Sequence, residues 1–381
     1  MKPEVSKNFE ERYKSLNAEQ ARAVDAIDGP LLVIAGPGSG KTELLSVRTA
    51  KILKEGHVSP GGILLLTFTD SGAQNMRDRL VSLIGEAGYR VAVYTFHSFA
   101  SDIISKYGEY FFNGAQYRPA TDVERVAIVE GILESLPKGH MLASKHPELG
   151  YTYTSDIMSS ISAIKKGDYT PAEWRQKIES LKSEYEAINN VVGEMFAESA
   201  GKRNVELVRN NYLKILEALR GVEGEVAKYL VNTLEIELKV SIERGEYKNL
   251  NDWRDEYFTK DTNNGSDIKI LKDSRNEKME KWLALADVYE KYDTKMLEEA
   301  LYDFDDMIFT VARTIEREPT LRSELEEKYQ YIMIDEFQDT NDAQMHLVEL
   351  LTSSPVNEGR PNIMVVGDDD QAIYKFQGAE L

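Results

Sequence analysis

Short apolar runs alternate with amphipathic stretches over the first third of the sequence. The runs LLVIA, ILLLT and VAVYT predict buried strands at Leu31–Ala35, Ile63–Thr67 and Val91–Thr95. Between them, apolar residues recur at helical spacing over Lys41–Leu53 and Gly72–Ile84. Strands that alternate with helices predict a parallel sheet with crossover helices.

The same alternation returns near the end of the sequence. Two further strands are predicted at Tyr331–Ile334 (YIMI) and Asn362–Val366 (NIMVV), with a helix around Asp342–Leu351 between them. Strands that are apolar on both sides belong in a sheet covered on both faces. The predicted fold class is therefore α/β.

The middle of the sequence has a different pattern. From about residue 112, short apolar runs typical of strands become rare, and long, charged helical patterns dominate. The clearest of these are Leu207–Leu219, Val226–Ile242 and Lys278–Leu301. We therefore predict that residues 1–111 and 301–381 form two parts of one α/β domain, and that residues 112–300 form an all-α subdomain inserted between them.

The amino-acid composition excludes several classes of protein. A chain of 381 residues with 42% hydrophobic side chains can bury the core of two domains, or of one domain with a large insertion. The absence of cysteine excludes a disulfide framework, a thiolate zinc site and a cysteine-ligated iron–sulfur cluster. No apolar run approaches the roughly 20 residues that a membrane span needs, and the N-terminus is polar. A cytoplasmic protein is expected.

The formal net charge of −19 argues against a basic nucleic-acid-binding surface. The excess is unevenly distributed: the net charge is 0 over residues 1–111, −7 over residues 112–300 and −12 over residues 301–381. A local aromatic platform remains a way to bind a single strand, because stacking does not depend on a basic surface.

The strand at Leu31–Ala35 leads into a glycine-rich loop and then a helix. Small residues let backbone N–H groups surround phosphates, while a lysine reaches the β and γ oxygens and a hydroxyl holds Mg²⁺. The start of the helix adds a favourable dipole for an anion. The predicted phosphate-binding residues are Gly36, Pro37, Gly38, Ser39, Gly40, Lys41 and Thr42, with Thr42 as a metal ligand.

Acidic residues follow the two later strands. Asp335 and Glu336 end the strand Tyr331–Ile334. Beside a phosphate loop, one such carboxylate can hold Mg²⁺ through water and its neighbour can accept a proton from an attacking water. After the last strand, Gln371 follows three aspartates and is placed to sense the γ-phosphate. The three aspartates by themselves are typical of an exposed acidic turn.

Ordered segments of the chain resemble those of the UvrD/Rep-type superfamily 1 DNA helicases. They are LNAEQ (16–20), AGPGSGKT (35–42), TFT (67–69), TFHSF (95–99), DFDD (303–306), DEFQDTN (335–341) and GDDDQAIYKFQGA (367–379). The resemblance covers residues 16–111 and 301–381 well. The insertion is similar only in position and helical character.

The resemblance implies a RecA-like P-loop NTPase domain that uses ATP and Mg²⁺. It implies that Gln20 recognises adenine and that Lys41 contacts the phosphates. Asp335 would coordinate Mg²⁺, Glu336 would act as the catalytic base, and Gln371 would couple the nucleotide to DNA.

The resemblance also implies single-stranded DNA and DNA junctions as partners. The DNA-binding residues would be Phe68, Thr95, His97, Tyr374 and Phe376. Aromatic rings in such a channel stack on bases without reading their sequence. Core packing is the alternative for the aromatic residues of these segments, above all for Phe96 and Phe99.

Several positions depart from the family pattern. Gln377 stands where the family usually has arginine. Thr69–Ala73 (TDSGA) lacks a lysine that would meet DNA phosphate, and Glu43 follows Thr42 where many relatives have a basic or neutral residue.

Three functions remain open at this point. The first is the ATPase core of a DNA translocase, present as its N-terminal portion. Its second motor domain, with the arginines that reach the γ-phosphate, would follow Leu381, so we expect this chain alone to bind nucleotide, hydrolyse it slowly at most and not unwind DNA. The second is a non-motor module that binds ATP or single strands. The third is the front of a helicase–nuclease similar to RecB or AddA.

Overall fold

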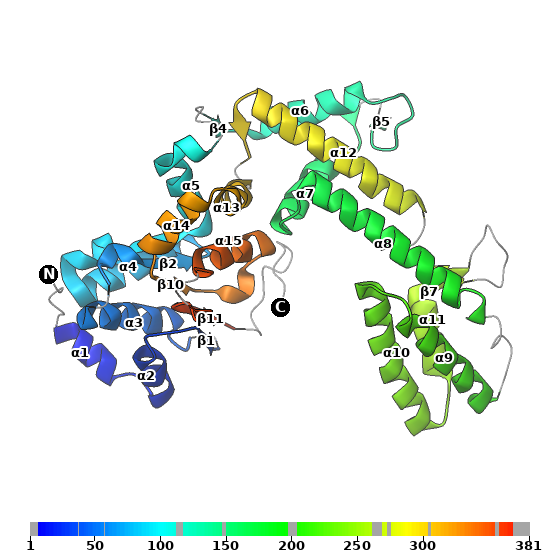
Figure 1. Cartoon of the computed structure of the whole chain (residues 1–381), viewed down its shortest axis with the longest axis horizontal. Helices are drawn as coiled ribbons and strands as arrows, with labels where there is room; N and C mark the ends of the chain where they lie inside the picture. The colour runs from blue at the N-terminus through cyan, green and yellow to red at the C-terminus, as the bar shows by residue number, and fades with distance from the viewer. Residues whose placement is uncertain are drawn as a thin grey trace. The chain divides into compact units, whose positions relative to one another are not determined.

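The computed structural model describes residues 7–36, 38–56, 58–111, 117–146, 150–196, 204–260, 269–272, 276–303, 306–354 and 358–368. The chain divides into two compact units, and Figure 1 labels most of their helices and strands. We call the first the α/β unit (Met1–Glu130, Thr154–Tyr169 and Tyr292–Leu381) and the second the helical unit (Gly131–Tyr153 and Thr170–Lys291). The helical unit lies entirely within the predicted insertion, residues 112–300, whereas residues 112–130, 154–169 and 292–300 of that segment belong to the α/β unit.

A five-stranded parallel sheet organises the α/β unit, with the strand order β1-β11-β10-β2-β3. The strands are β1 (Leu31–Ile34), β2 (Ile63–Thr67), β3 (Ala92–Thr95), β10 (Tyr331–Ile334) and β11 (Ile363–Gly367). In a parallel sheet all the strands end at one edge. The segments that follow them, where the predicted site residues lie, therefore meet at that edge.

The helices of the α/β unit are α1 (Lys7–Lys14), α2 (Ala18–Asp25), α3 (Lys41–Glu55), α4 (Asp70–Ile84), α5 (Phe96–Lys106), α7 (Thr154–Lys166), α13 (Met307–Arg317), α14 (Pro319–Lys328) and α15 (Asp342–Thr352). A short parallel pair, β4 (Arg118–Pro119) with β9 (Leu301–Tyr302), lies outside the main sheet. The chain passes between the two units within α6 (Asp122–Ser135) and α12 (Asn276–Glu298), and also just before α7 and before α8 (Pro171–Val192).

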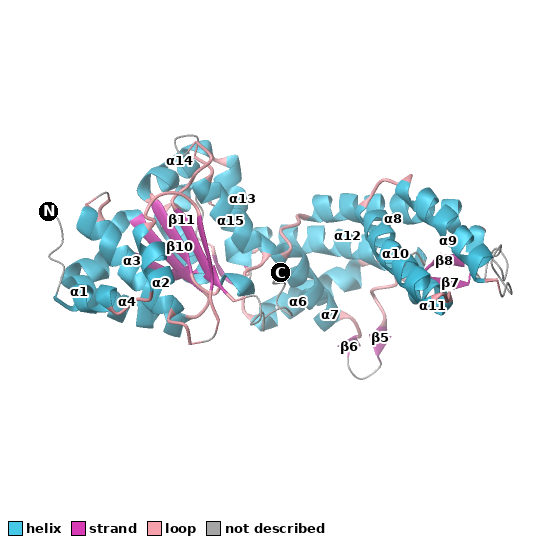
Figure 2. Ribbon diagram, turned by 90° about the horizontal axis from the view of Figure 1, so that it is seen from below, coloured by secondary structure: helices cyan, strands magenta, loops and turns pink. Residues whose placement is uncertain are grey.

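Helices cover both faces of the sheet, as Figure 2 shows. Along β2 the alternation of side chains directs Leu65 into the core beneath α3 and α4, and Leu64 into the core beneath α5, α13 and α15. All residues of β2 and β10 are buried. The predicted α/β class with a P-loop-type parallel sheet is therefore confirmed.

The edge strand β1 departs from the expectation of two covered faces. Leu32 is 60% exposed and Ile34 is 68% exposed, whereas β2 and β10 are completely buried. An edge strand has a neighbouring strand on one side only, and its outer face is covered only where another element reaches it. The exposed side chains of β1 line a cavity that is described below.

Predicted and observed element boundaries differ by one or two residues in most cases. The largest difference is at the last helix of the insertion, which was expected to reach Leu301. It ends at Glu298, and Ala300 has φ 54°. That left-handed backbone ends a helix, because a side chain there clashes with the following carbonyl. Leu301 then begins β9.

The helical unit contains α8 (Pro171–Val192), α9 (Val205–Arg220), α10 (Glu225–Arg244), α11 (Lys248–Tyr257) and most of α12. Its core is built on Tyr212, Leu234 and Trp253. Two short antiparallel pairs correct the all-α expectation: β5 (Lys145–His146) with β6 (Gly150–Tyr151), and β7 (Phe258–Lys260) with β8 (Lys269–Leu271). The second pair forms because Phe258 and Leu271 are buried in the helical core.

No helix in the described part of the chain combines the length and the apolar character needed to cross a membrane.

Candidate functional site

The loop between β1 and α3 has the backbone that a phosphate-binding loop requires. Gly38 has φ 70° and Gly40 has φ 82°, in the left-handed region that glycine adopts without steric cost. Gly40 is also the N-cap of α3 and offers no side-chain acceptor to the first turn. The N–H groups at the start of this helix therefore have an anion as their natural partner. Pro37 lies outside the described residues.

Lys41 and Thr42 connect this loop to the ends of two other strands. Lys41 Nζ donates a hydrogen bond to the carbonyl of Ala35 at 2.9 Å and lies 3.8 Å from Asp368 Oδ2. Thr42 Oγ1 donates to Asp335 Oδ2 at 3.2 Å. A hydroxyl and a carboxylate oxygen side by side are the hard ligands that Mg²⁺ prefers. Thr42 and Asp335 therefore fit the predicted metal site.

Asp335 and Glu336 lie in different surroundings although they are adjacent. Asp335 is buried, which raises the pKa of its carboxyl against the lowering by Thr42. Glu336 is only partly buried, and its pKa is raised first by desolvation and then by the charges of Asp335 and Asp339. A raised pKa brings a carboxylate closer to the range in which it accepts and releases a proton.

The backbone of Glu336 is constrained as well. It has φ 56° and ψ 41°, a left-handed conformation that costs a non-glycine residue about 1–2 kcal/mol. Strained backbone of this kind often occurs at functional sites. Phe68, at the end of β2, also gives a backbone hydrogen bond to the Glu336 carboxylate. The candidate base is thus in direct contact with the segment predicted to bind DNA.

Two residues of this site were missed by the sequence reasoning. Asp368 is 4% exposed, so the acidic turn predicted after β11 begins with a buried carboxylate that faces Lys41. Gln338 Oε1 accepts a hydrogen bond from the Asp368 backbone at 3.0 Å and joins the ends of β10 and β11. A Cβ on Gly367 would lie 2.9 Å from that Gln338 oxygen and 3.3 Å from the Gln338 backbone nitrogen, so a larger residue there would displace the Gln338 side chain. The signal available in the sequence was a polar run after each of two apolar strands.

Glu43, which departs from the family pattern, lies in the first turn of α3 and forms ion pairs with arginines outside the phosphate loop. Its carboxylate pairs with Arg79 at 2.5 Å and with Arg12 at 3.4 Å. Its charge is therefore balanced locally by two arginines.

Gln20 lies in the first turn of α2, and its side chain reaches the phosphate loop. Its Nε2 donates to the Ser39 carbonyl at 2.9 Å, and its Oε1 accepts from the Asn17 backbone at 3.0 Å. Each atom of the amide retains one further hydrogen-bonding position. A cavity of about 660 Å³ opens beside it, with Leu32 and Ile34 among its lining residues. Its volume is in the usual range for a small-molecule site, and the apolar side chains of β1 share its wall with polar groups that include Gln20, Ser39 and Lys41.

A second cavity, of about 250 Å³, contains two of the predicted DNA-binding residues. Phe68 and His97 both line it and both are partly buried. Thr95 is buried, and its hydroxyl accepts a hydrogen bond from Ser98 N at 3.1 Å as the N-cap of α5. Its observed role is to fix the start of α5, which carries His97. Phe96 and Phe99 belong to the core, the alternative raised from the sequence.

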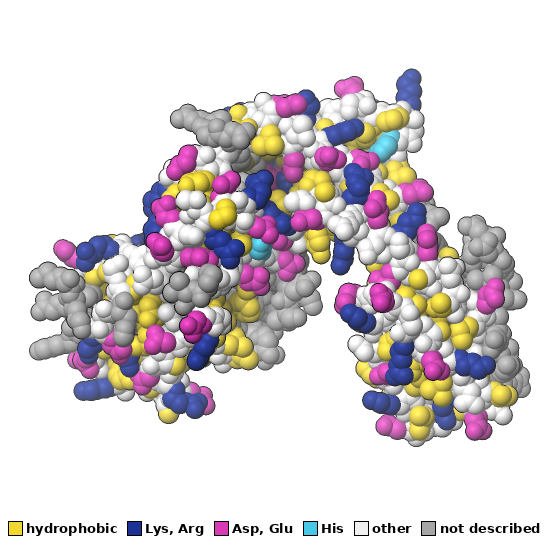
Figure 3. Space-filling model, in the orientation of Figure 1, with side chains coloured by type: hydrophobic (Ala, Val, Ile, Leu, Met, Phe, Trp, Pro, Cys, Tyr) yellow, Lys and Arg dark blue, Asp and Glu magenta, His cyan; other side chains and the backbone are white. Residues whose placement is uncertain are grey.

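The structure brings most of the predicted site residues to one edge of the sheet. The phosphate loop, Asp335, Glu336 and Phe68 each follow the end of a strand there. Gln371, Tyr374 and Phe376 lie outside the described residues. On the face shown in Figure 3, basic and acidic side chains are interspersed. This agrees with a binding site built from a few local residues and not from a broad basic surface.

Comparison with known proteins shows the family. The model of the UvrD/REP helicase N-terminal domain matches residues 16–236 and 222–381. The ATP-dependent DNA helicase PcrA of Bacillus subtilis (strain 168) is 27% identical over 366 residues, which are 96% of this chain and 34% of that protein. PcrA of Staphylococcus epidermidis (strain ATCC 12228 / FDA PCI 1200) is 28% identical over 368 residues, 97% of this chain and 35% of that protein.

The chain therefore spans about a third of the length of the relatives it matches. The family model nevertheless matches almost the whole chain, from residue 16 to residue 381. On this ground the chain belongs to the UvrD/REP helicase N-terminal domain family.

Proposed function

We propose that this chain is the ATP-binding motor portion of a DNA helicase, and that the whole protein uses ATP hydrolysis to move along single-stranded DNA and to unwind junctions. The observation that supports this most is the meeting of Lys41, Thr42, Asp335 and Glu336 at one edge of the sheet. Phosphoryl transfer needs positioning and charge stabilisation more than covalent chemistry, and these residues supply both.

Each residue has a role in this proposal. The backbone of the glycine loop and Lys41 bind the β and γ phosphates. Thr42 and Asp335 hold Mg²⁺, which when bound neutralises charge on the phosphate oxygens. Glu336 accepts the proton of the attacking water. Asp368, which faces Lys41, keeps the ammonium directed toward the phosphate loop.

The base of the nucleotide is assigned to the larger cavity. Its apolar wall on β1 suits a purine ring, and the remaining donor and acceptor of Gln20 match the N6 and N7 edge of adenine. The bond from Gln20 to Ser39 connects recognition of the base to the loop that binds the phosphates.

Single-stranded DNA is assigned to the cavity that Phe68 and His97 line. Stacking on aromatic rings supplies sequence-tolerant affinity in a protein whose net charge is −19. The hydrogen bond between the Phe68 backbone and Glu336 gives a short path from bound DNA to the catalytic base. Gln371, Tyr374 and Phe376 complete the proposed set through the family resemblance.

Calorimetric titration with ATP and Mg²⁺ tests the nucleotide site. Lys41→Ala should weaken binding about 10–100-fold, because a hydrogen bond to a charged group is worth roughly 1.5–3 kcal/mol. Lys14→Ala is the matched control, since Lys14 is an exposed lysine at the end of α1 in the same unit. Equal ATP affinity in the Lys41 variant and the Lys14 variant would refute the assignment.

A further inference from the structure

The smaller cavity contains a lysine that the proposed function does not yet use. We propose that Lys166, the last residue of α7, binds a backbone phosphate of single-stranded DNA in the cavity lined by Phe68 and His97. The inference rests on the proposed function and extends it by one residue. It brings the segment Thr154–Tyr169, which lies between two stretches of the helical unit in the sequence, into the DNA site.

Separate parts of the α/β unit, α13 with Ile308 among them, form the walls of this cavity. Phe68 follows β2, His97 lies in the first turn of α5, Lys166 ends α7, and Asn341 and Gln344 lie at the start of α15. The volume of about 250 Å³ is below the roughly 300–1,000 Å³ of sites for drug-sized ligands. A cavity of this size suits one phosphate and its sugar next to a base stacked at its mouth.

Two adjacent lysines line the cavity, and their surroundings differ. Lys165 is buried, and its Nζ pairs with Asp293 at 2.9 Å and with Asp306. Two carboxylates thus already balance its charge. Lys166 is partly buried, and within the described part of the chain no carboxylate lies within 4.0 Å of its ammonium group as a salt-bridge partner. Of the two, Lys166 is the cation whose charge is left for a ligand.

The backbone around the cavity also favours an anion. Both α5 and α15 begin there, and each is an 11-residue helix whose N-terminus carries a partial positive charge. One acidic residue, Asp339, lies in the wall as well, and its Oδ2 accepts a hydrogen bond from Gln338 Nε2 at 3.1 Å. The charge of Lys165 is balanced by its two carboxylates, and Asp339 adds a negative charge to the wall. The positive charge comes from Lys166 and the two helix N-termini, so Lys166 is the main attraction for a phosphate.

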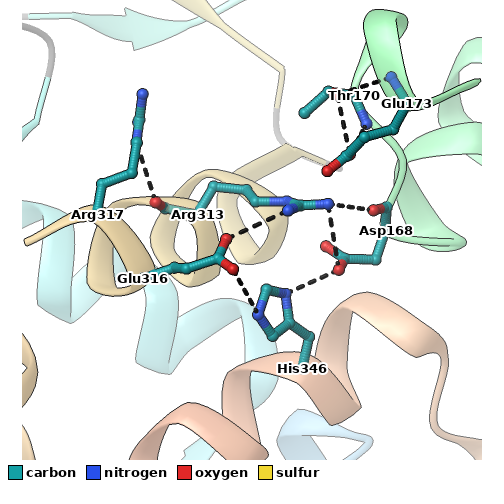
Figure 4. Close-up of polar contacts among 7 residues, drawn as sticks. All are labelled: Asp168, Thr170, Glu173, Arg313, Glu316, Arg317 and His346. Atoms are coloured by element: carbon teal, nitrogen blue, oxygen red, sulfur yellow. Dashed lines mark hydrogen bonds and ion pairs between the residues drawn. The ribbon is translucent and has the colours of Figure 1, made fainter. Parts of the chain in front are cut away.

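The position of Lys166 is fixed by the turn that follows it. Figure 4 shows Asp168 enclosed by side chains of α13 and α15. Its Oδ2 lies 2.8 Å from His346 Nδ1 and 3.4 Å from Arg313 Nη2, and Arg313 also donates to the Asp168 carbonyl. Asp168 has φ 59°, a left-handed backbone that does not continue the helical path of α7. The backbone of a lysine two residues before such an anchor is already ordered, so binding a phosphate orders mainly its side chain.

The sequence that follows Phe68 gives a second reason to assign the phosphate contact to Lys166. Thr69–Ala73 contains no lysine or arginine. A strand that stacks on Phe68 finds no cation in the five residues that follow it, whereas Lys166 lines the same cavity from α7.

Fluorescence anisotropy with a labelled oligothymidine, repeated over a range of salt concentrations, tests this inference. For a single strand, each phosphate neutralised by a lysine contributes about 0.7 to the slope of log K against log salt. Lys166→Gln should lower that slope by about 0.7 and weaken binding most at low salt. Lys166→Arg should restore the wild-type slope. Phe68→Ala should weaken binding with little change of slope, because stacking releases no counterions.

Lys14→Gln is the matched control, because Lys14 lies on α1, which packs on α3 and α4 at the opposite face of the sheet. Thermal unfolding of each variant verifies that it is folded. A Lys166→Gln slope equal to that of Lys14→Gln would overturn the role of Lys166. Wild-type protein that binds no oligonucleotide would instead overturn the proposed DNA function. If inorganic phosphate competes as well as the oligonucleotide at equal phosphate concentration, the cavity is a free-anion site and the proposal is wrong.

Discussion

Glu336 combines three features that separate it from the other carboxylates at the sheet edge. Its backbone is left-handed, its pKa is raised by burial and by Asp335 and Asp339, and it receives a hydrogen bond from Phe68. Asp335, one residue earlier, is buried and bonded to Thr42. The two neighbours are therefore suited to different tasks, proton acceptance for Glu336 and metal binding for Asp335.

Replacement of Glu336 by Gln should remove turnover and leave nucleotide binding intact. A positioned general base contributes about 10²–10⁴-fold to a rate. We expect single-turnover phosphate release to fall by that factor, while the affinity for ATP and Mg²⁺ changes less than threefold, on the order of 0.6 kcal/mol. Glu349→Gln, an exposed position on α15, is the control. Unchanged phosphate release in the Glu336 variant would assign the base to another residue.

Gln20 is predicted to select adenine through the free positions of its amide. Gln20→Ala should reduce the preference for ATP over GTP by about 10-fold, because a hydrogen-bonded site discriminates at roughly 1–3 kcal/mol per bidentate pair. Competition binding with the two nucleotides measures this preference. If GTP already competes equally with ATP in the wild-type protein, Gln20 does not read the base.

At the scale of elements, α15 connects the acidic motif to the turn after α7. The helix begins with a reciprocal cap, in which Asn341 Oδ1 accepts from Gln344 N at 3.0 Å and Gln344 Oε1 accepts from Asn341 N at 3.1 Å. One turn later His346 contacts Asp168 (Figure 4). A single helix thus fixes the end of the DEFQDTN segment and the position of the Lys166 turn.

The contact of His346 should make stability depend on pH. The hydrogen bond to Asp168, more than the burial that opposes it, raises the pKa of His346 above 6.5, with Glu316 adding to the effect and Arg313 reducing it. The folded protein therefore binds this proton more tightly than the unfolded chain does. The stabilisation is complete below pH 6.5 and is lost as the pH rises through the folded-state pKa.

His346→Gln should consequently lower the melting temperature more at about pH 5.5 than at about pH 8.5. Burial raises the pKa of Asp306 to about 7, so Asp306 titrates in the same range, and only the difference between wild type and variant isolates His346. In an Asp168→Asn background this pH-dependent difference should shrink toward zero. A difference that is the same at both pH values would show that His346 is not protonated in the contact.

At the scale of the whole molecule, the chain matches its relatives over about a third of their length. We propose that the α/β unit is the first ATP-binding motor domain and that the helical unit is the subdomain inserted into it. Among the residues that we assign to the phosphate site, Lys41 is the cation. By family resemblance, arginines of a second motor domain would supply the remaining positive charge at the γ-phosphate.

We therefore predict that this chain alone binds ATP, hydrolyses it at most slowly and does not unwind DNA. Arginines that reach the γ-phosphate from another domain are worth about 10³–10⁵ in rate. Translocation also needs two states that grip the strand differently. Steady-state phosphate release with and without single-stranded DNA measures this. DNA-stimulated turnover of roughly 1 s⁻¹ or more that Glu336→Gln abolishes would contradict the prediction.

The local pattern of apolar and polar residues was sufficient to predict the strands of the main sheet and most of the helices of this protein. The apolar runs around Leu65 and Met333 favour buried strands because they are short and alternate with helical stretches, and the glycines before Lys41 favour a tight anion-binding loop. Asp335 and Glu336 were predictable for the same reason, because they directly follow a strand. In each case the information lies within a few consecutive residues, where steric limits and side-chain periodicity act.

Tertiary structure alone decided which distant residues meet. The pairing of Asp368 with Lys41, the bridge made by Gln338 and the cavity shared by Phe68 and Lys166 depend on strand order, which periodicity does not specify. The same holds for Thr95, whose hydroxyl caps a helix, and for the open face of β1. These features follow from packing between elements far apart in the sequence, and the physical reason is that burial and electrostatic contact depend on distance in space.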